Sequence, residues 1–380
     1  MKRILFTSWY SGLGGGETDL LTLADALPAT EYECQLLLPR DGQLGQRWRG
    51  AGRRTHFIGY RGASTWFVPA LWARFRVVKR FADLLKRERI DLVHADYHTL
   101  PLIAPAARRA RVPLCWTVWG WWFRPKPWQR AFFRGLPAVA RSRAIRAGFL
   151  GDPPFMPAAE LPVIYSGVDT KRFHPQVDGA GLRRELGLRQ DALVVAMAAR
   201  FQRVKGHHTF QTMAERVLAE APQTQFIIAG DDVFGVAADQ RYRDQILERA
   251  HSSLLLRDRL HYIGFRDDVE SVYATADVFV CPSDFESYGK ANLEAMACGR
   301  PVVSSRRGGP SETILDTVTG FLVDSGDAEA LAAQVLRLLR EGDLRHQMGR
   351  AAHEHASVRF SAGAAAAAQK RYFDDLLRLS

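Results

Sequence analysis

Short apolar runs alternate with helical patterns along this chain, and the alternation occurs twice. In the first half the runs have the length and composition of buried strands, and helical patterns lie between them, near 20–27, 68–86 and 101–109. The predicted strands are 3–7, 34–38, 55–58, 90–94 and 114–118. Strands that alternate with helices form parallel sheets covered on both faces, so the sequence predicts an α/β fold.

The second cycle begins after a short polar, glycine-bearing stretch at 176–181, where we place the domain junction. Five further strands are predicted at 192–199, 226–229, 260–263, 278–281 and 302–304. Helical patterns between and after them lie at 206–220, 242–253, 328–340, 344–357 and 362–379. A chain of 380 residues is too long for one ordinary domain and suits two α/β domains.

Composition narrows the class of protein without selecting a partner. The 52 lysines and arginines exceed the 41 acidic residues by 11, an excess that attracts nucleic acid, anionic lipid or phosphorylated ligands. The four cysteines form no C-x-x-C pair and are expected to be reduced core thiols. Neither a membrane span nor a signal peptide is apparent, so we expect a cytoplasmic location.

The segment 284–309 carries the most chemistry. Its sequence begins D-F-E-S-Y-G-K-A-N-L-E-A-M-A-C-G-R-P-V-V, with Glu286 and Glu294 eight positions apart around a glycine turn. Good helix formers follow this turn, Gly299 ends the predicted helix, and a buried strand comes next. A helix N-terminus favours an anion. Carboxylates beside such a site indicate a ligand with both hydroxyls and phosphate, as in a nucleotide sugar.

This run resembles the signature of the family 4 retaining glycosyltransferases, also called glycosyl transferases group 1. The resemblance rests on Glu-x7-Glu followed by A-M-A-x-G-x-P-V-V. It implies the GT-B fold, in which two Rossmann-like parallel-sheet domains face a central cleft. By this resemblance the acceptor-binding domain spans 1–170, the nucleotide-sugar-binding domain spans 171–358, and a C-terminal helix, 359–380, packs back on the first domain.

The resemblance also implies a reaction. A hexose-type sugar would pass from a nucleotide-diphosphate sugar to a glycan, lipid-linked or small-molecule acceptor. The new linkage would be α, formed by a front-face mechanism in which the donor phosphate takes the acceptor proton. The family needs no metal or other cofactor, and we expect none here.

By resemblance, the signature also supplies the sugar and ribose contacts. Glu286 would bind a hydroxyl of the donor sugar, and Glu294 the ribose, whose vicinal hydroxyls suit a bidentate carboxylate. The remaining predicted donor-binding residues of this half are Ser287, Tyr288, Gly289, Lys290, Phe265 and Gly230. Phe265 lies where the family contacts the base. Gly230 begins a Gly-Asp-Asp turn that we interpret as a cleft rim rather than a metal site.

Two cations follow the first strand of the second domain. Arg200 and Lys205 match the R-x4-K pair with which the family clamps the diphosphate. Charge builds on the leaving diphosphate as the glycosidic bond breaks, so fixed cations stabilise the transition state most. The alternative is a solvated basic turn.

A glycine loop follows the first strand of the chain. Gly14, Gly15, Gly16 and Glu17 resemble the G-G-x-E loop with which the family touches the donor diphosphate and the acceptor. A dinucleotide fingerprint would need G-x-G-x-x-G spacing, which is absent. A tight strand–helix turn without a ligand is the remaining alternative.

The chain departs from the family at one position. Trp119 stands where the family usually has a histidine, and an indole cannot accept a proton. His94, Asp96 and His98 follow another predicted strand and could supply a polar group instead, or could be structural hydrogen-bonders. The departure puts acceptor or sugar positioning in doubt.

Aromatic and cationic residues are interleaved between 116 and 133. They could form a patch on an anionic membrane surface, an acceptor site in which Trp121 and Trp122 stack on rings, or ordinary packing. Stacking of single-stranded nucleic acid is a minor option beside the nucleotide-sugar signature, and we expect no nucleic-acid partner. Two rival functions stay open: a nucleotide-sugar epimerase on the same fold, and a non-catalytic nucleotide-sugar-binding scaffold.

Overall fold

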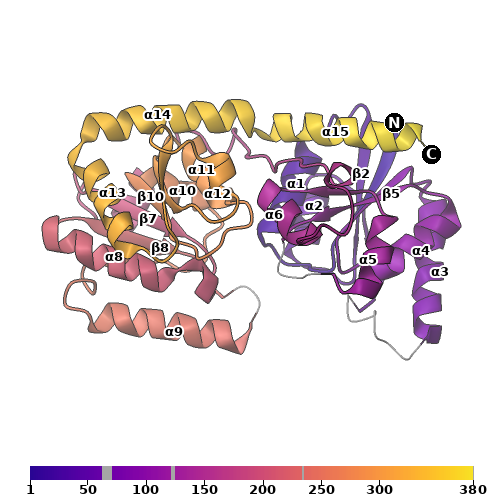
Figure 1. Ribbon diagram of the computed structural model, residues 1–380, viewed down its shortest axis with the longest axis horizontal. Helices are drawn as coiled ribbons and strands as arrows, with labels where there is room; N and C mark the ends of the chain where they lie inside the picture. The colour runs from indigo at the N-terminus through magenta and orange to yellow at the C-terminus, as the bar shows by residue number, and fades with distance from the viewer. Residues whose placement is uncertain (62–70, 121–124, 233–234, 380) are drawn as a thin grey trace. The chain divides into compact units, whose positions relative to one another are not determined.

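A computed structural model describes residues 1–380 apart from 62–70, 121–124, 233–234 and 380 (Figure 1). The chain divides into two compact units, each with its own core. Unit 1 contains residues 1–167 and 362–380, and unit 2 contains residues 168–361. The boundary after residue 167 lies three residues before the one that the resemblance implies and nine residues before the polar stretch at 176–181. The boundary after residue 361 lies three residues after the implied boundary at 358.

Unit 1 is built on a parallel sheet of six strands in the order β3-β2-β1-β4-β5-β6. The strands are β1 (Lys2–Thr7), β2 (Tyr32–Leu38), β3 (Thr55–Phe57), β4 (Leu92–Ala95), β5 (Leu114–Val118) and β6 (Ala138–Ala140). The flanking helices are α1 (Gly15–Ala26), α2 (Gln43–Gly50), α3 (Leu71–Arg87), α4 (Leu100–Ala110), α5 (Pro127–Arg134), α6 (Arg143–Leu150) and α15 (Ala362–Arg378). A 3-10 turn, Ala158–Glu160, follows α6.

Unit 2 repeats this topology. Its parallel sheet has the order β12-β11-β10-β7-β8-β9, which is the order of unit 1 when β7 is counted as the first strand. The strands are β7 (Val194–Ala198), β8 (Gln225–Ala229), β9 (Leu260–Tyr262), β10 (Val278–Cys281), β11 (Val302–Ser305) and β12 (Gly320–Val323). The helices are α7 (Ala180–Glu185), α8 (His207–Glu220), α9 (Ala237–Ser252), α10 (Val269–Thr275), α11 (Lys290–Ala297), α12 (Pro310–Thr313), α13 (Ala328–Arg340) and α14 (Gly342–Arg359), with a 3-10 turn at Arg203–Lys205.

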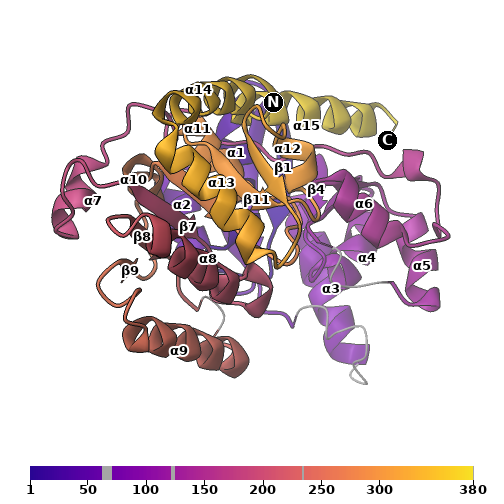
Figure 2. The ribbon, with the colours of Figure 1, turned by 60° about the vertical axis from the view of Figure 1, so that its left-hand side comes forward.

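Both sheets are apolar on each face, as parallel sheets must be when helices cover both sides. In unit 2, α8 and α13 pack side by side over one face (Figure 2). Their buried side chains, such as Phe210 and Val335, join Val195, Val280 and Val303 of the strands in one core. This arrangement confirms the two Rossmann-like domains that the alternation predicted.

The last helix belongs to unit 1, as the resemblance implied. Phe373 of α15 is fully buried against the core that contains Phe6, and Gln369 is also buried. Asp374 accepts hydrogen bonds from Lys2 and from the hydroxyl of Tyr32, each at 2.6 Å. Residues 362–378 thus pack beside α1 in the layer of helices that covers the sheet of unit 1.

In each sheet the strand order reverses beside the first strand of the unit. The reversal lies between β1 and β4 in unit 1 and between β7 and β10 in unit 2. Ligands of doubly wound sheets bind beyond the carboxyl ends of the strands at such a point. The fold therefore directs attention to the loops after β1 and β4 and to those after β7 and β10.

Candidate functional site

The loops after β7 and β10 meet backbone to backbone. Gly206, which ends the 3-10 turn at Arg203–Lys205, has a φ of +72°, and a Cβ on it would lie 2.1 Å from the carbonyl oxygen of Pro282. Only glycine fits such a contact in the left-handed region. In addition, the Asp284 N–H donates to the carbonyl oxygen of Val204 at 2.8 Å. The segment that carries Lys205 is therefore fixed against the segment that leads to Glu286.

Lys205 and Glu286 form an ion pair at this junction. The Lys205 Nζ lies 2.5 Å from the Glu286 Oε2, and the two side chains are 18% and 15% exposed. The Ser283 hydroxyl donates to the same carboxylate oxygen at 3.4 Å. A partly buried pair is screened less than a surface pair. The structure thus brings together two predicted site residues that are 81 positions apart in sequence.

The backbone of Glu286 is fixed from the other side by the loop after β11. Its carbonyl oxygen accepts from the Gly309 N–H at 2.8 Å, and its own N–H donates to the carbonyl oxygen of Arg307 at 3.2 Å. Gly308 permits this approach, because a Cβ on it would lie 2.1 Å from the Glu286 carbonyl oxygen. Backbone hydrogen bonds therefore fix the position of the residue that carries this carboxylate.

The helix α11 begins directly after this carboxylate. Gly289 caps it in the left-handed conformation with a φ of +86°, and Lys290 is the first helical residue. The first N–H groups of a helix have no intrahelical acceptor and face outward as donors. Ser287 and Tyr288 form the turn, and Tyr288 is buried, so its backbone rather than its ring is what the turn presents.

Glu294 lies one turn into α11. Its carboxylate accepts a hydrogen bond from the Tyr273 hydroxyl at 2.8 Å. Burial raises its pKa, while the charges of Lys290 and Arg172 and the Tyr273 bond act in the opposite direction. The carboxylate thus stands on the same short helix that begins at the Gly289 turn.

The remaining predicted residues of unit 2 lie along the same sheet edge. Arg200 follows β7 and is partly buried. Gly230 follows β8, and its N–H donates to the carbonyl oxygen of Gly264 at 2.8 Å. Phe265 directly follows Gly264, and its side chain is 49% exposed. An exposed ring fixed at the carboxyl edge of a sheet can stack on a planar group.

The corresponding edge of unit 1 carries two carboxylates. The Asp96 Oδ1 accepts from the Thr7 hydroxyl at 2.9 Å and from the Thr99 hydroxyl, and the Oδ2 accepts from the His98 N–H at 2.9 Å. Burial raises the pKa of Asp96. These bonds tie the carboxyl ends of β1 and β4 together at the point of strand reversal.

Glu17 lies beside them in the first turn of α1. The Gly14 N–H donates to its Oε2 at 3.1 Å, and the Ser8 hydroxyl contacts its Oε1 at 3.5 Å. Burial raises the pKa of Glu17 to about 7, with the charge of Asp96 adding to the shift. Glu17 can therefore exchange a proton near neutral pH. Among the loop glycines, no atom lies within 4 Å of a Cβ built on Gly15, whereas a Cβ on Gly16 would contact the Trp119 indole.

Trp119 rests on a buried cation. The Arg141 guanidinium lies 5.1 Å from the centre of its ring, within the range of a cation–π contact. Arg141 is 3% exposed, pairs with Asp19 at 3.4 Å, and donates to the side chain of Gln369 at 3.1 Å. The residue that replaces the family's histidine is thus anchored by an ion pair and by α15.

The two predicted site histidines of unit 1, His94 and His98, have different surroundings. His94 is 2% exposed, its Nε2 pairs with the Thr117 hydroxyl at 2.8 Å, and burial lowers its pKa to about 3. These contacts favour the structural alternative for His94. His98 is exposed and its ring lies 5.1 Å from that of Trp9, which is 41% exposed. Sequence reasoning missed Trp9, although an aromatic residue directly after the first strand was a usable signal.

The aromatic segment after β5 is partly core. Trp116 and Phe133 are each 1% exposed with ring centres 5.2 Å apart, so packing accounts for them. Trp121 and Trp122 lie outside the described residues.

None of the described helices is long and apolar enough to cross a bilayer. Within the described part of the chain, no three His, Cys, Asp or Glu side chains gather as metal ligands would.

Two family models match the chain, one for each unit. The model described as glycosyl transferases group 1 matches residues 180–355. The model described as glycosyltransferase family 4 matches residues 13–172. Together they include the loops after β4, β7 and β10 and the end of the loop after β1.

Curated relatives give the same grouping. The chain is 30% identical over 209 residues to the putative glycosyltransferase YtcC of Bacillus subtilis, which covers 52% of this chain and 50% of the relative. It is 25% identical over 347 residues to the UDP-Gal:alpha-D-GlcNAc-diphosphoundecaprenol alpha-1,3-galactosyltransferase of Escherichia coli, covering 86% of this chain and 85% of the relative. The chain spans about half the length of several curated relatives that it matches.

A solved structure shares the fold. The crystal structure of Anabaena Alr3699/HepE in complex with UDP and glucose matches with a TM-score of 0.81 and 24% sequence identity. The match covers 98% of this chain and 100% of that chain. At this level of identity the likeness concerns the architecture alone, and it is the two-sheet architecture described above.

Proposed function

This chain belongs to the glycosyl transferases group 1 family, and we propose that it transfers a hexose-type sugar from a nucleotide-diphosphate sugar to an acceptor hydroxyl. The transfer would retain the α configuration of the donor. The single observation that carries the proposal is the Lys205–Glu286 pair, 2.5 Å apart, beside the start of α11. It supplies a cation for phosphate and a carboxylate for sugar hydroxyls beside a helix N-terminus, where the helix dipole favours an anion.

Each group has a part in the proposed reaction. Without a donor, Lys205 neutralises Glu286. With a donor bound, the ammonium would contact the diphosphate and the carboxylate would accept from sugar hydroxyls. As the bond between the anomeric carbon and the phosphate oxygen breaks, negative charge grows on the diphosphate, and Lys205, Arg200 and the first N–H groups of α11 would stabilise it. The departing phosphate oxygen would take the proton of the acceptor hydroxyl, which attacks the same face of the sugar.

The acceptor would bind at the edge of unit 1. Glu17 and Asp96 present carboxylate oxygens that can accept from hydroxyls, and the Trp9 and His98 rings offer an exposed stacking surface. A glycan or lipid-linked acceptor fits hydroxyl recognition of this kind. The name of the Escherichia coli relative includes a diphosphoundecaprenol-linked sugar, which supports a lipid-linked acceptor here.

We also propose that the protein contacts an anionic membrane surface, and α3 is the observation that favours it. The exposed residues of this helix include Arg74, Arg76, Lys79 and Arg80, together with Phe75, which is 61% exposed. Basic residues near an anionic surface contribute about 1 kcal/mol each. Sedimentation with vesicles containing phosphatidylserine should therefore weaken as salt rises, and the loss of α3 charges should abolish it.

The decisive experiment follows the anomeric configuration of the product by NMR after incubation with donor and acceptor. A panel of nucleotide sugars, ranked by the rise in melting temperature, would first identify the donor. An α product from an α donor supports the proposal, and an inverted product contradicts it. Product formed from donor alone would indicate the epimerase.

A second experiment separates the enzyme from a non-catalytic scaffold. Glu286→Ala should abolish use of the donor, because it removes the proposed sugar-binding carboxylate and leaves Lys205 without its partner. Nucleotide-sugar binding by the wild type with no turnover on any acceptor would favour the scaffold. Unchanged donor use by Glu286→Ala would remove Glu286 from the sugar site.

A further inference from the structure

A second cationic site lies in unit 2, at the edge of the sheet opposite the proposed donor site. A cavity of about 430 Å³ is lined by Pro175, Asp277, Gly299, Arg300, Pro301, Arg345, His346, Arg350 and His353. Asp277 directly precedes β10 and Pro301 directly precedes β11, so the cavity adjoins the amino ends of these strands. The four residues of β10 separate the two sites by roughly 13 Å.

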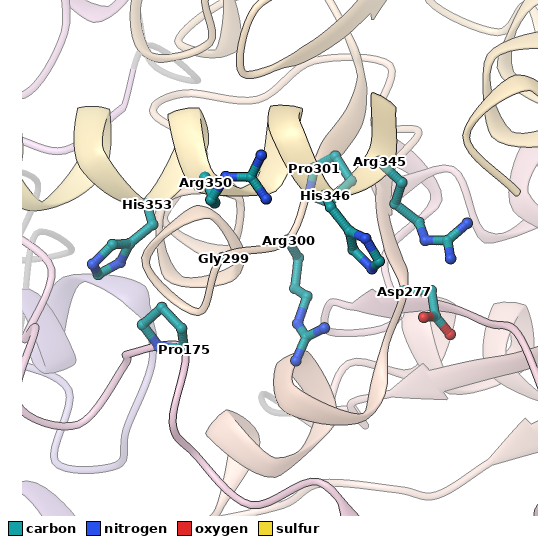
Figure 3. Close-up of a pocket in the computed structure, with 9 residues that line it drawn as sticks. All are labelled: Pro175, Asp277, Gly299, Arg300, Pro301, Arg345, His346, Arg350 and His353. Carbon is teal, nitrogen blue, oxygen red and sulfur yellow. The ribbon is translucent and has the colours of Figure 1, made fainter. Parts of the chain in front are cut away.

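The lining is strongly cationic. Three arginines and two histidines surround the cavity, and Figure 3 shows that Arg345, His346, Arg350 and His353 all project from α14. Asp277 is the one carboxylate among the lining residues. Its charge is already engaged, because the Oδ2 lies 3.3 Å from the Arg183 Nη2 and accepts from the Val194 N–H at 2.8 Å. Asp277 also acts on Arg300, but one carboxylate does not balance the charge of the three arginines in the walls.

Helix capping explains part of this cluster. The helices α10, α11 and α13 end near this edge, and their last carbonyl oxygens attract cations. Arg300 donates to the carbonyl oxygen of Ala274 at 2.8 Å, His353 pairs with that of Ala297 at 2.7 Å, and Arg345 donates to that of Leu338 at 2.8 Å.

Capping leaves donors unused. The Nε of Arg300 is buried and has no hydrogen-bond partner among the described residues. Burial also lowers the pKa of Arg300, so its charge would gain from a nearby anion. The side chains of Arg350 and His346 make no hydrogen bond or ion pair with any residue that the structure describes. Both side chains are exposed, so solvent or a ligand can reach them.

We propose that this cavity binds a small phosphate-bearing anion, at a site separate from the sugar-transfer site. Arginine forks and imidazoles are the side chains that recognise phosphate, and the exposed side chains of Arg350 and His346 can reach an anion in the cavity. The volume lies within the range of small-molecule sites, about 300–1,000 Å³, and leaves room for an organic group beside the phosphate. The phosphate could belong to a free metabolite or to a lipid headgroup.

Calorimetry with inorganic pyrophosphate tests the proposal in the full-length chain. Lys205→Ala serves as the background, because it weakens pyrophosphate binding at the donor site. In this background, Arg350→Glu combined with His346→Ala should weaken pyrophosphate binding at least tenfold. Arg359→Ala removes an exposed arginine of the same helix from outside the cavity and should change binding less than twofold.

Equal pyrophosphate affinity in the double variant and its parent would overturn the proposal, as would the absence of pyrophosphate binding in the Lys205→Ala background. If the double variant does not fold, as judged by its melting temperature, Arg350→Ala alone is measured, and it should weaken binding at least threefold. Vesicles with and without phosphatidic acid distinguish the two sources. Binding that depends on Arg350 only when vesicles are present would assign the site to a lipid headgroup instead of a free anion.

Discussion

The carboxyl edge of the sheet in unit 2 carries a lysine paired with a glutamate, whereas that of unit 1 carries Glu17 and Asp96. Neither of these two carboxylates has a lysine or arginine ion pair within the described residues. Both sheets have the same strand order and reverse at the same place. The comparison teaches that topology fixes where a ligand can bind, while the loops decide which ligand suits the place. A lysine paired with a carboxylate can bind an anionic diphosphate. Carboxylates that accept hydrogen bonds from hydroxyl groups can bind a neutral acceptor.

The largest effect is expected when the Lys205–Glu286 ion pair of unit 2 is broken. Lys205→Ala should lower turnover at least tenfold, and on the order of 100-fold or more, because loss of one fixed charge-stabilising donor costs about 3–4 kcal/mol in a transition state. Steady-state kinetics with donor and acceptor would measure it. Lys171→Ala, which removes an exposed lysine of the same unit, should leave turnover unchanged. Unchanged turnover in Lys205→Ala would contradict the phosphate clamp.

The next effect concerns the proton on Glu17. Its pKa in the folded protein, about 7, lies above the ordinary value of 4.5, so the folded state binds this proton more tightly than the unfolded state does. The stability due to protonated Glu17 is complete below about pH 4.5 and is lost as the pH rises to about 7. Each pKa unit corresponds to about 1.4 kcal/mol.

Glu17→Gln cannot ionise. Its free energy of unfolding, relative to wild type, should therefore rise by roughly 3 kcal/mol between pH 4.5 and pH 7.5. Urea denaturation across this range measures the difference. Glu160→Gln, which changes an exposed carboxylate of unit 1, should show no such trend. A flat difference for Glu17→Gln would mean that its carboxylate is solvated.

A smaller effect tests whether the units divide donor from acceptor. Glu294→Gln should raise the KM for the donor about tenfold, because hydrogen bonds to a charged group contribute about 1.5–3 kcal/mol. The KM for the acceptor should stay within twofold. Glu354→Gln, on the exposed face of α14, is the matched control. A rise in the acceptor KM alone would reverse the proposed division.

The smallest effect concerns Trp119, whose indole lies beside Gly16 of the glycine loop. Trp119→Ala should raise the acceptor KM about fivefold, in line with the roughly 0.5–1.5 kcal/mol of an aromatic contact. Trp119→Phe keeps a ring over Arg141 and should restore most of the affinity. If both variants lose affinity equally, the ring is not the feature that matters.

The fold could be predicted from sequence except at its margins. Ten strands stood out as apolar runs, but β6 and β12, which end their sheets, did not. β6 has three residues, two of them alanine, and β12 begins with Gly320, which lies against the carbonyl oxygen of Val302. Other strands of these sheets are equally short, but the alanines of β6 and the leading glycine of β12 weaken the apolar run that marks a strand. Both strands form because a neighbouring strand supplies the hydrogen bonds.

The residues of the candidate site could be predicted from the sequence, but the contacts between them could not. The resemblance named Lys205 and Glu286, yet no spacing rule brings together positions so far apart in sequence. Arg141 was missed because arginine is seldom buried, and nothing near it in sequence reveals the partners Asp19 and Gln369. His94 lies near the carboxyl end of β4, within the strand, and the packing of Phe6 and Phe373 on its ring is what separates a core histidine from a ligand.

The return of α15 to unit 1 affects the order in which the protein can be completed on the ribosome. Residues 168–361 emerge as one uninterrupted stretch, so unit 2 has its whole sequence available before the helix that carries Gln369 and Phe373 is translated. Until then the nascent first unit leaves Phe6 uncovered and Arg141 without its amide acceptor. The unit translated first is therefore the unit finished last.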